Sequence, residues 1–218
     1  MTVLTDRPSS TQADGFDRSD SAVYALARAS YIAGSNSNSG TTIITGQRNN
    51  AGTYQLFQGF VRFSLSTIPT TSIVLSATFE YTTSSAAISA ESDLEMLGYD
   101  AGTLVEAADY QGGAGVGSLA NYGTIDATAN STATTTYQKA LNSTGVAAIQ
   151  ANLGGNFGMA LIATDFVNNS APAGDGRYTI RSSEDATAAN RPALIVTYSE
   201  NLGRGIVSGP KVKRMRIV

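Results

Sequence analysis

The chain has 218 residues, of which 42% are hydrophobic and only 14% are charged. It contains no cysteine and no histidine, which excludes disulfides, thiolate metal sites and catalysis built on histidine, such as a Ser-His-Asp triad. The length and the many Ser, Thr, Asn and Gly residues favour one domain of short strands joined by turns.

The charge is distributed unevenly along the chain. Residues 1–200 hold nine basic and 17 acidic groups, whereas the last 18 residues hold five basic groups and no acid. The N-terminus shows no apolar run behind a basic start, and no apolar stretch is long enough to span a bilayer. We therefore expect no export signal, no membrane insertion, an acidic body and a basic C-terminal segment.

The pattern of apolar residues predicts an all-β fold, a jelly-roll-like antiparallel β-sandwich with one short helix. Residues 1–20 are polar and unpatterned, so we expect an N-terminal arm there, a sandwich over 21–200 and a C-terminal arm over 201–218. In chain order, strands are expected at 22–32, 42–45, 55–64, 72–82, 94–99, 156–164, 177–182 and 193–199. The helix is expected at 143–153, capped by Ser143 or Thr144, and surface loops at 34–40 and 111–133.

Three stretches carry a family resemblance. The first is GFVRFSLS at 59–66, followed by Ile68-Pro69 and the strand at 73–79. The second, at 141–163, leads from a short helix into the N-x-G-x-x-L pattern that starts at Asn156. The third is IRSSE at 180–184, followed by RPALIVTY at 191–198. Together they resemble the DNRLRE-type domain family, a group of β-sandwich modules similar to carbohydrate-binding modules.

The resemblance covers about residues 22–199 and implies a sandwich fold. Members of the family occur in bacterial secreted and surface proteins, and some bind acidic polysaccharides, so the resemblance also implies glycan binding. This chain departs from the pattern at Ser64, where the family has Asp, and by having no Trp in the middle third. An aromatic sugar-stacking platform is therefore not implied.

Two groups of side chains in the body are candidates for chemistry. Arg62, Arg181 and Glu184 could bind a polyanion, but we favour an ion pair that joins two strands, because a buried Arg requires a partner. The acids between 93 and 109 match neither the spacing of a glycosidase pair nor that of a Ca²⁺ loop, so we expect scattered surface acids and no cofactor (Asp93, Glu95, Asp100, Glu106 and Asp109). Four tyrosines are expected to be exposed and could stack on sugars or simply line the rim (Tyr54, Tyr110, Tyr122 and Tyr137).

The C-terminal arm mixes basic and apolar residues. Its predicted partner-binding residues are Arg204, Lys211, Val212, Lys213, Arg214, Met215, Arg216 and Ile217. Nucleic acid is disfavoured as a partner, because no aromatic residues interleave the charges and the body is acidic. The alternation instead suits a strand added to the edge of a neighbouring subunit.

These features lead to three functional hypotheses from different classes. The favoured one is a non-enzymatic structural protein of a bacteriophage virion, a capsid cement, decoration or fibre-base protein that docks to other virion proteins or to copies of itself. The alternative is an extracellular or cell-surface carbohydrate-binding module for a host surface glycan or acidic polysaccharide. An enzyme using Tyr and carboxylates is disfavoured, because nothing in the sequence brings such groups together.

Overall fold

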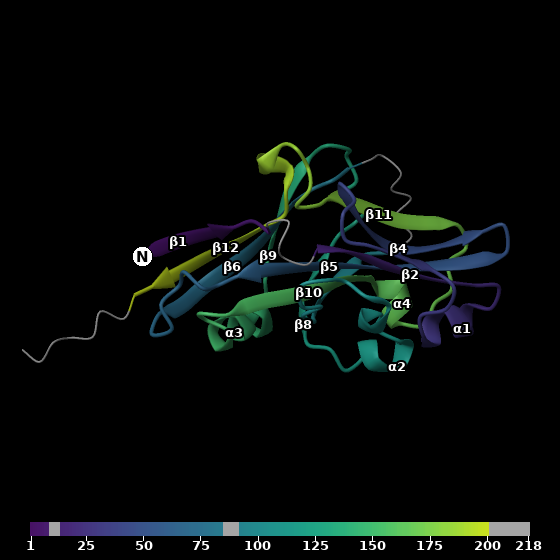
Figure 1. The fold of residues 1–218 in the computed structure, drawn as a ribbon, viewed down its shortest axis with the longest axis horizontal. Helices are drawn as coiled ribbons and strands as arrows, with labels where there is room; N and C mark the ends of the chain where they lie inside the picture. The colour runs from purple at the N-terminus through teal and green to yellow at the C-terminus, as the bar shows by residue number, and fades with distance from the viewer. Residues whose placement is uncertain (9–13, 85–91, 201–218) are drawn as a thin grey trace, which may run out of the picture.

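The computed structural model of the protein describes residues 1–8, 14–84 and 92–200. Most elements in this part of the chain are strands, which form two antiparallel sheets (Figure 1). The prediction of an all-β sandwich is confirmed, while the jelly-roll order of strands stays a prediction.

The small sheet has four strands in the order β1-β12-β6-β9. They are β1 (Thr2–Asp6), β12 (Ala193–Ser199), β6 (Ile73–Thr82) and β9 (Thr136–Ala140). In β6, Ala77, Phe79 and Tyr81 are buried, whereas Ser76 is exposed and Thr78 is half-buried. Alternation with a period of two therefore holds over residues 76–81, whose apolar face is directed at the core. It fails at the start of the strand, where Val74 is buried and Leu75 is 47% exposed, because the pairing with β12 shifts register there.

The large sheet runs in the order β11-β4-β5-β10-β7-β8, with β2 and β3 attached through β5. Its strands are β11 (Asp175–Arg181), β4 (Thr42–Asn50), β5 (Thr53–Ser64), β10 (Asn156–Ala163), β7 (Leu94–Gly98), β8 (Asn121–Ile125), β2 (Asp14–Ser21) and β3 (Ser35–Ser37). Residues 59–61 of β5 pair with β2 and also with β10, so these two strands lie on opposite edges of β5. β4 pairs with residues 53–57 and therefore shares one edge of β5 with β10.

Both faces of β5 are covered. On one face Phe63 meets Phe79 of the small sheet, with ring centroids 6.1 Å apart. The other face lies under a cap formed by the 99–120 segment and three short helices, α1 (Tyr24–Ala29), α2 (Gly113–Val116) and α4 (Thr164–Val167). Tyr110 anchors this cap, since its hydroxyl donates to the carbonyl of Ala27 (2.8 Å) and its ring packs on Phe166. Figure 1 shows these helices together at one side of the strands.

Several predicted elements have different structures. Residues 22–32 contain helix α1 rather than a strand, because the run YALARA has good intrinsic helix propensity and its one buried residue, Ala27, belongs to the hydrophobic core. The loop expected at 34–40 contains β3, and the loop expected at 111–133 contains α2 and β8. The predicted helix is confirmed as α3 (Ser143–Ala151), but Asn142 caps it by accepting from the amide of Gly145 (3.0 Å).

The expectation of an N-terminal arm over 1–20 was wrong for the residues described. β1 pairs along its whole length with β12, and β2 pairs with eight residues of β5. β2 buries polar side chains, among them Asp14, Asp17 and Ser19, so a pattern based on apolar residues could not detect it. The predicted C-terminal arm lies outside the described residues. None of the helices in 1–8, 14–84 and 92–200 is long and apolar enough to cross a membrane.

Candidate functional site

Four neighbouring strands of the large sheet align two rows of residues, which together carry three arginines and two aspartates. The register places Asp175 of β11 beside Arg48 of β4, Arg48 beside Gln55 of β5, and Gln55 beside Asp20 of β2. Paired residues share one face of a sheet, and residues two positions apart on a strand point to the same side.

The second row lies two positions along the same strands. It places Arg177 beside Gly46, Gly46 beside Phe57, and Phe57 beside Arg18. The two rows therefore form one surface, which we call the arginine face. Its side chains are Arg18, Asp20, Arg48, Gln55, Phe57, Asp175 and Arg177.

A continuous polar network joins the four residues of the first row to Arg177 and Arg18, which lie at the two ends of the second row. Arg177 donates two hydrogen bonds to Asp175, at 2.7 and 2.6 Å, and Asp175 lies 3.8 Å from a terminal nitrogen of Arg48. Arg48 donates to the side-chain oxygen of Gln55.

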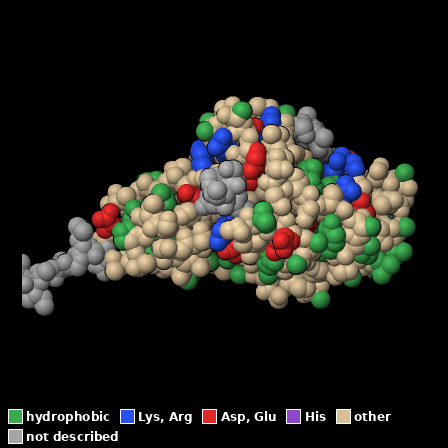
Figure 2. Space-filling view, viewed as in Figure 1, with side chains coloured by type: hydrophobic (Ala, Val, Ile, Leu, Met, Phe, Trp, Pro, Cys, Tyr) green, Lys and Arg blue, Asp and Glu red, His purple; other side chains and the backbone are tan. Residues whose placement is uncertain are grey.

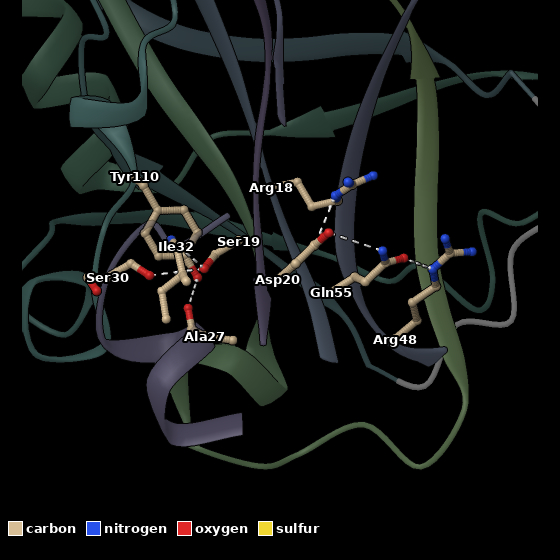
Figure 3. Close-up of polar contacts among 9 residues, drawn as sticks. All are labelled: Arg18, Ser19, Asp20, Ala27, Ser30, Ile32, Arg48, Gln55 and Tyr110. Carbon is tan, nitrogen blue, oxygen red and sulfur yellow. Dashed lines mark hydrogen bonds and ion pairs between the residues drawn. The ribbon is translucent and has the colours of Figure 1, made fainter. Parts of the chain in front are cut away.

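The network continues from Gln55 into β2. Gln55 donates to Asp20 at 3.3 Å, and Asp20 lies 2.9 Å from Nε of Arg18 (Figure 3). Figure 3 also shows Ser19 on the opposite side of β2, beneath Tyr110 of the cap. The strand thus separates the arginine face from the capped interior.

Phe57 occupies the centre of the arginine face. The guanidinium carbons of Arg18 and Arg177 lie 5.8 and 5.9 Å from its ring centroid, within the range of cation–π contact. Phe57 is only 3% exposed, because the two arginines and the ring of Phe16, 6.0 Å away between centroids, pack against it. The ring therefore orients guanidinium groups and is not itself a platform for a sugar ring.

The arginine face carries a local excess of positive charge, since it has three arginines and two aspartates. Hydrogen bonds from Arg177 lower the pKa of Asp175, while burial and the charge of Arg177 lower the pKa of Arg48. The side chains of Arg18, Arg48 and Arg177 remain 21 to 28% exposed. Figure 2 shows Lys and Arg side chains gathered beside acidic ones over the β11 part of the surface.

The chemistry available to this face is the binding of anions. A guanidinium group presents a planar fork of donors that matches carboxylate, sulfate or phosphate oxygens. In the part of the chain that the structure describes, Arg18 makes one polar contact, through Nε to Asp20, so its terminal nitrogens can serve a ligand. Asp175, which is 43% exposed, is the acid that such a ligand would compete with.

The predicted ion pair among Arg62, Arg181 and Glu184 was wrong in its partners. Arg62 lies 2.9 Å from Asp100, and Arg181 lies 3.3 Å from Asp185. Glu184 instead lies with a carboxylate oxygen 3.0 Å from the hydroxyl oxygen of Ser183. Arg62 is on β5 and Arg181 on β11, which β4 separates, so each arginine takes an acid from a nearby loop.

The other sequence candidates lie apart from the arginine face. Glu95 accepts from Asn121, and Asp109 accepts from Tyr99 and from the amide of Glu106. The four tyrosines expected to be exposed are not: two are buried and two are half-buried (Tyr110 and Tyr122; Tyr54 and Tyr137). Among the described residues, no three His, Cys, Asp or Glu side chains group as metal ligands.

The predicted partner-binding residues 204–217 lie outside the described residues. The arginine face itself was missed because Arg18 and Asp20 fall in the segment expected to be an arm, and Arg48 falls after the strand expected at 42–45. The one signal in the sequence is the two-residue spacing of charges in D-R-S-D at 17–20 and D-G-R at 175–177.

Comparisons with known proteins assign no family. No protein-family model matches the chain, and a search of curated proteins found no similar sequence.

Proposed function

We propose that the chain is a non-catalytic binding domain whose arginine face takes an acidic polysaccharide that bears carboxylate or sulfate groups. The observation that supports this most is the pair Arg18 and Arg177, held on either side of Phe57 with guanidinium groups partly exposed. The resemblance to a family with glycan-binding members points the same way.

The dimensions of the face suit an extended polymer. The backbones of Arg177, on β11, and Arg18, on β2, are three strand spacings apart, or roughly 14 Å. Their guanidinium groups lie closer together, because both contact the ring of Phe57. An acidic glycan lying across the strands would present several anionic groups to the arginines in turn. Because the side chains are already ordered by Asp20, Asp175 and Phe57, little rotamer entropy is lost on binding.

This proposal predicts a loss of affinity when the two outer arginines are neutralised. The double variant Arg18→Gln and Arg177→Gln should bind a polyuronate or sulfated glycan at least tenfold more weakly, because each truncated charge contact costs on the order of 1 kcal/mol. Calorimetric titration at low and high salt measures the effect, and wild-type binding should weaken as salt screens the charges.

The matched control is Arg191→Gln, which removes the same charge from a residue that contacts Asp185 instead. Its affinity should equal that of the wild type. Equal binding by the double variant, or equal binding of a neutral glycan by the wild type, would contradict the proposal.

A second proposal is the structural role in a phage virion, and a feature of the small sheet favours it. Within 1–8, 14–84 and 92–200, no strand pairs with the outer edge of β1. Val3, Ile73 and Leu75 of the same sheet are 59, 53 and 47% exposed. An open edge beside exposed apolar side chains is suited to receive a strand from another chain. We propose residues 204–218 of a neighbouring copy as that strand.

Deleting residues 204–218 should then abolish self-association or incorporation into the particle, while the melting temperature of the body stays unchanged. Light scattering after size exclusion, and particle incorporation, measure the result. A matched variant that replaces only Lys211, Lys213, Arg214 and Arg216 with Gln separates the charges from the apolar residues. Normal assembly of the deletion variant would refute this role.

A further inference from the structure

Asp17 is buried without any group to neutralise it. Its side chain is 0% exposed, and within the described residues neither carboxylate oxygen accepts a hydrogen bond. It lies on β2 between Arg18 and Phe16, but successive residues of a strand point to opposite faces, so Arg18 is on the other side of the sheet. A buried carboxylate without donors costs several kcal/mol, so something must compensate the charge.

The cross-strand neighbours of Asp17 are two residues with side-chain amides. The register places Gln58 of β5 on one side of it and Asn36 of β3 on the other. Above this face lies the cap segment, tied to β5 by a reciprocal pair of 2.8 Å hydrogen bonds between the side chain of Gln58 and the backbone of Gln111.

A second carboxylate, Asp109, comes from the cap. Burial raises the pKa of Asp17 to about 7, and the charge of Asp109 contributes to the increase. Asp109 is only half-buried, and its oxygens accept from Tyr99 (2.9 Å) and from the amide of Glu106 (2.7 Å). Asp109 lies two residues before Gln111, whose backbone is bonded to Gln58, the cross-strand neighbour of Asp17. The two acids therefore face the same junction between β2 and the cap, and the half-buried one gives access from solvent.

We propose that Asp17 and Asp109 bind a hard divalent cation, Ca²⁺, which ties β2 to the cap. A cation neutralises both acids at once, whereas a single proton relieves only one. The chain offers no histidine or cysteine, so every ligand must be oxygen, which is the preference of Ca²⁺ and Mg²⁺. A mostly buried, irregular set of carboxylate and amide oxygens suits Ca²⁺ better than Mg²⁺, which requires near-octahedral geometry and retains several waters.

The test is thermal unfolding at pH 7.5 after treatment with a chelator, with and without added Ca²⁺ or Mg²⁺. Saturating Ca²⁺ should raise the melting temperature of the wild type by about 5 °C or more, because a ligand specific to the native state stabilises it in proportion to the logarithm of its concentration. Mg²⁺ should raise it less. Asp17→Asn should lose the response to Ca²⁺.

The matched control is Asp14→Asn, the same change at another buried acid of β2, which should keep the response to Ca²⁺. Luminescence of Tb³⁺ excited through tyrosine gives a second readout, since the chain has no Trp and Tyr99 hydrogen-bonds to Asp109. The emission should appear in the wild type, compete with Ca²⁺ and fall severalfold in Tyr99→Phe. This readout decides the question even if Asp17→Asn does not fold.

Three outcomes would overturn the proposal. In the first, Ca²⁺ changes neither the melting temperature nor the Tb³⁺ emission, and Asp17→Asn is as stable as the wild type. Asp17 would then be neutralised by a proton instead of a cation. The second is a full response to Ca²⁺ in Asp17→Asn. The third is Tb³⁺ emission undiminished in Tyr99→Phe, since the ion would then lie elsewhere.

Discussion

Replacing Gly46 by alanine should destabilise the domain by about 3 kcal/mol and lower its melting temperature by roughly 6 to 12 °C. Gly46 adopts a φ of +100°, a region that side chains other than glycine rarely occupy. A Cβ atom there would lie 2.4 Å from the carbonyl oxygen of Gly176 on β11. Strain and collision therefore act together, at the position where β4 passes between Arg177 and Phe57.

Two other glycines separate these contributions. Gly52 has a φ of +87° but no atom within 4 Å of its added Cβ, so Gly52→Ala should cost only about 1 kcal/mol of strain. Gly117 has neither a positive φ nor a neighbour, so Gly117→Ala should be neutral within about 0.5 kcal/mol. Urea unfolding of the three variants measures the series. A cost for Gly46→Ala no greater than that for Gly52→Ala would show that β11 moves away without penalty.

The stability of the protein should fall as the pH rises from about 4 to 7, and Asp14 should account for a large share of the change. Asp14 is 2% exposed and accepts hydrogen bonds from the amide and hydroxyl of Ser183, at 2.6 and 2.8 Å. Burial raises its pKa to about 7, and the adjacent Glu184 contributes to the increase.

The sign of the pH effect follows from proton binding. An unfolded Asp releases its proton near pH 4, while the folded protein keeps the proton on Asp14 until about pH 7. Between these values the native state binds more protons, so the free energy of unfolding decreases with rising pH and levels off above pH 7. The loss is on the order of 2 to 4 kcal/mol.

Asp14→Asn tests this assignment. The amide cannot ionise, yet it can accept from Ser183 and donate to Glu184, so the variant should be more stable than the wild type at pH 8 by on the order of 2 kcal/mol. Urea unfolding at pH 5 and pH 8, at one fixed Ca²⁺ concentration, measures the difference. An unchanged pH dependence in the variant would assign the effect to another group.

The regular strands illustrate what local pattern can predict. β5, β6, β10 and β12 were expected nearly at their observed bounds, because each has apolar residues that the core buries on at least one face. β2 was not expected, because its interior positions are filled by Asp14, Asp17 and Ser19 rather than by apolar side chains. Its place in the sheet depends on pairing with β5, which no local pattern records.

The candidate sites depend on the same kind of long-range pairing. Arg18, Arg48 and Arg177 come from three strands far apart in the chain, and their alignment exists only through the register of β2, β4, β5 and β11. The partners of the ion pairs also depend on the tertiary fold, since Arg62 lies beside Asp100 and not beside the predicted Glu184.

The sequence by itself determined the all-β class, the excess of acid in the body, the basic C-terminal segment and the absence of histidine and cysteine chemistry. These properties follow from composition and from apolar periodicity, which act locally. Only the tertiary structure decided that β1 and β2 belong to the sheets, that Arg18 and Arg177 lie against Phe57, and that Asp17 is buried on the side of β2 that faces the cap. Those facts depend on which strands pair, and pairing is set by the burial of whole faces rather than by any single segment.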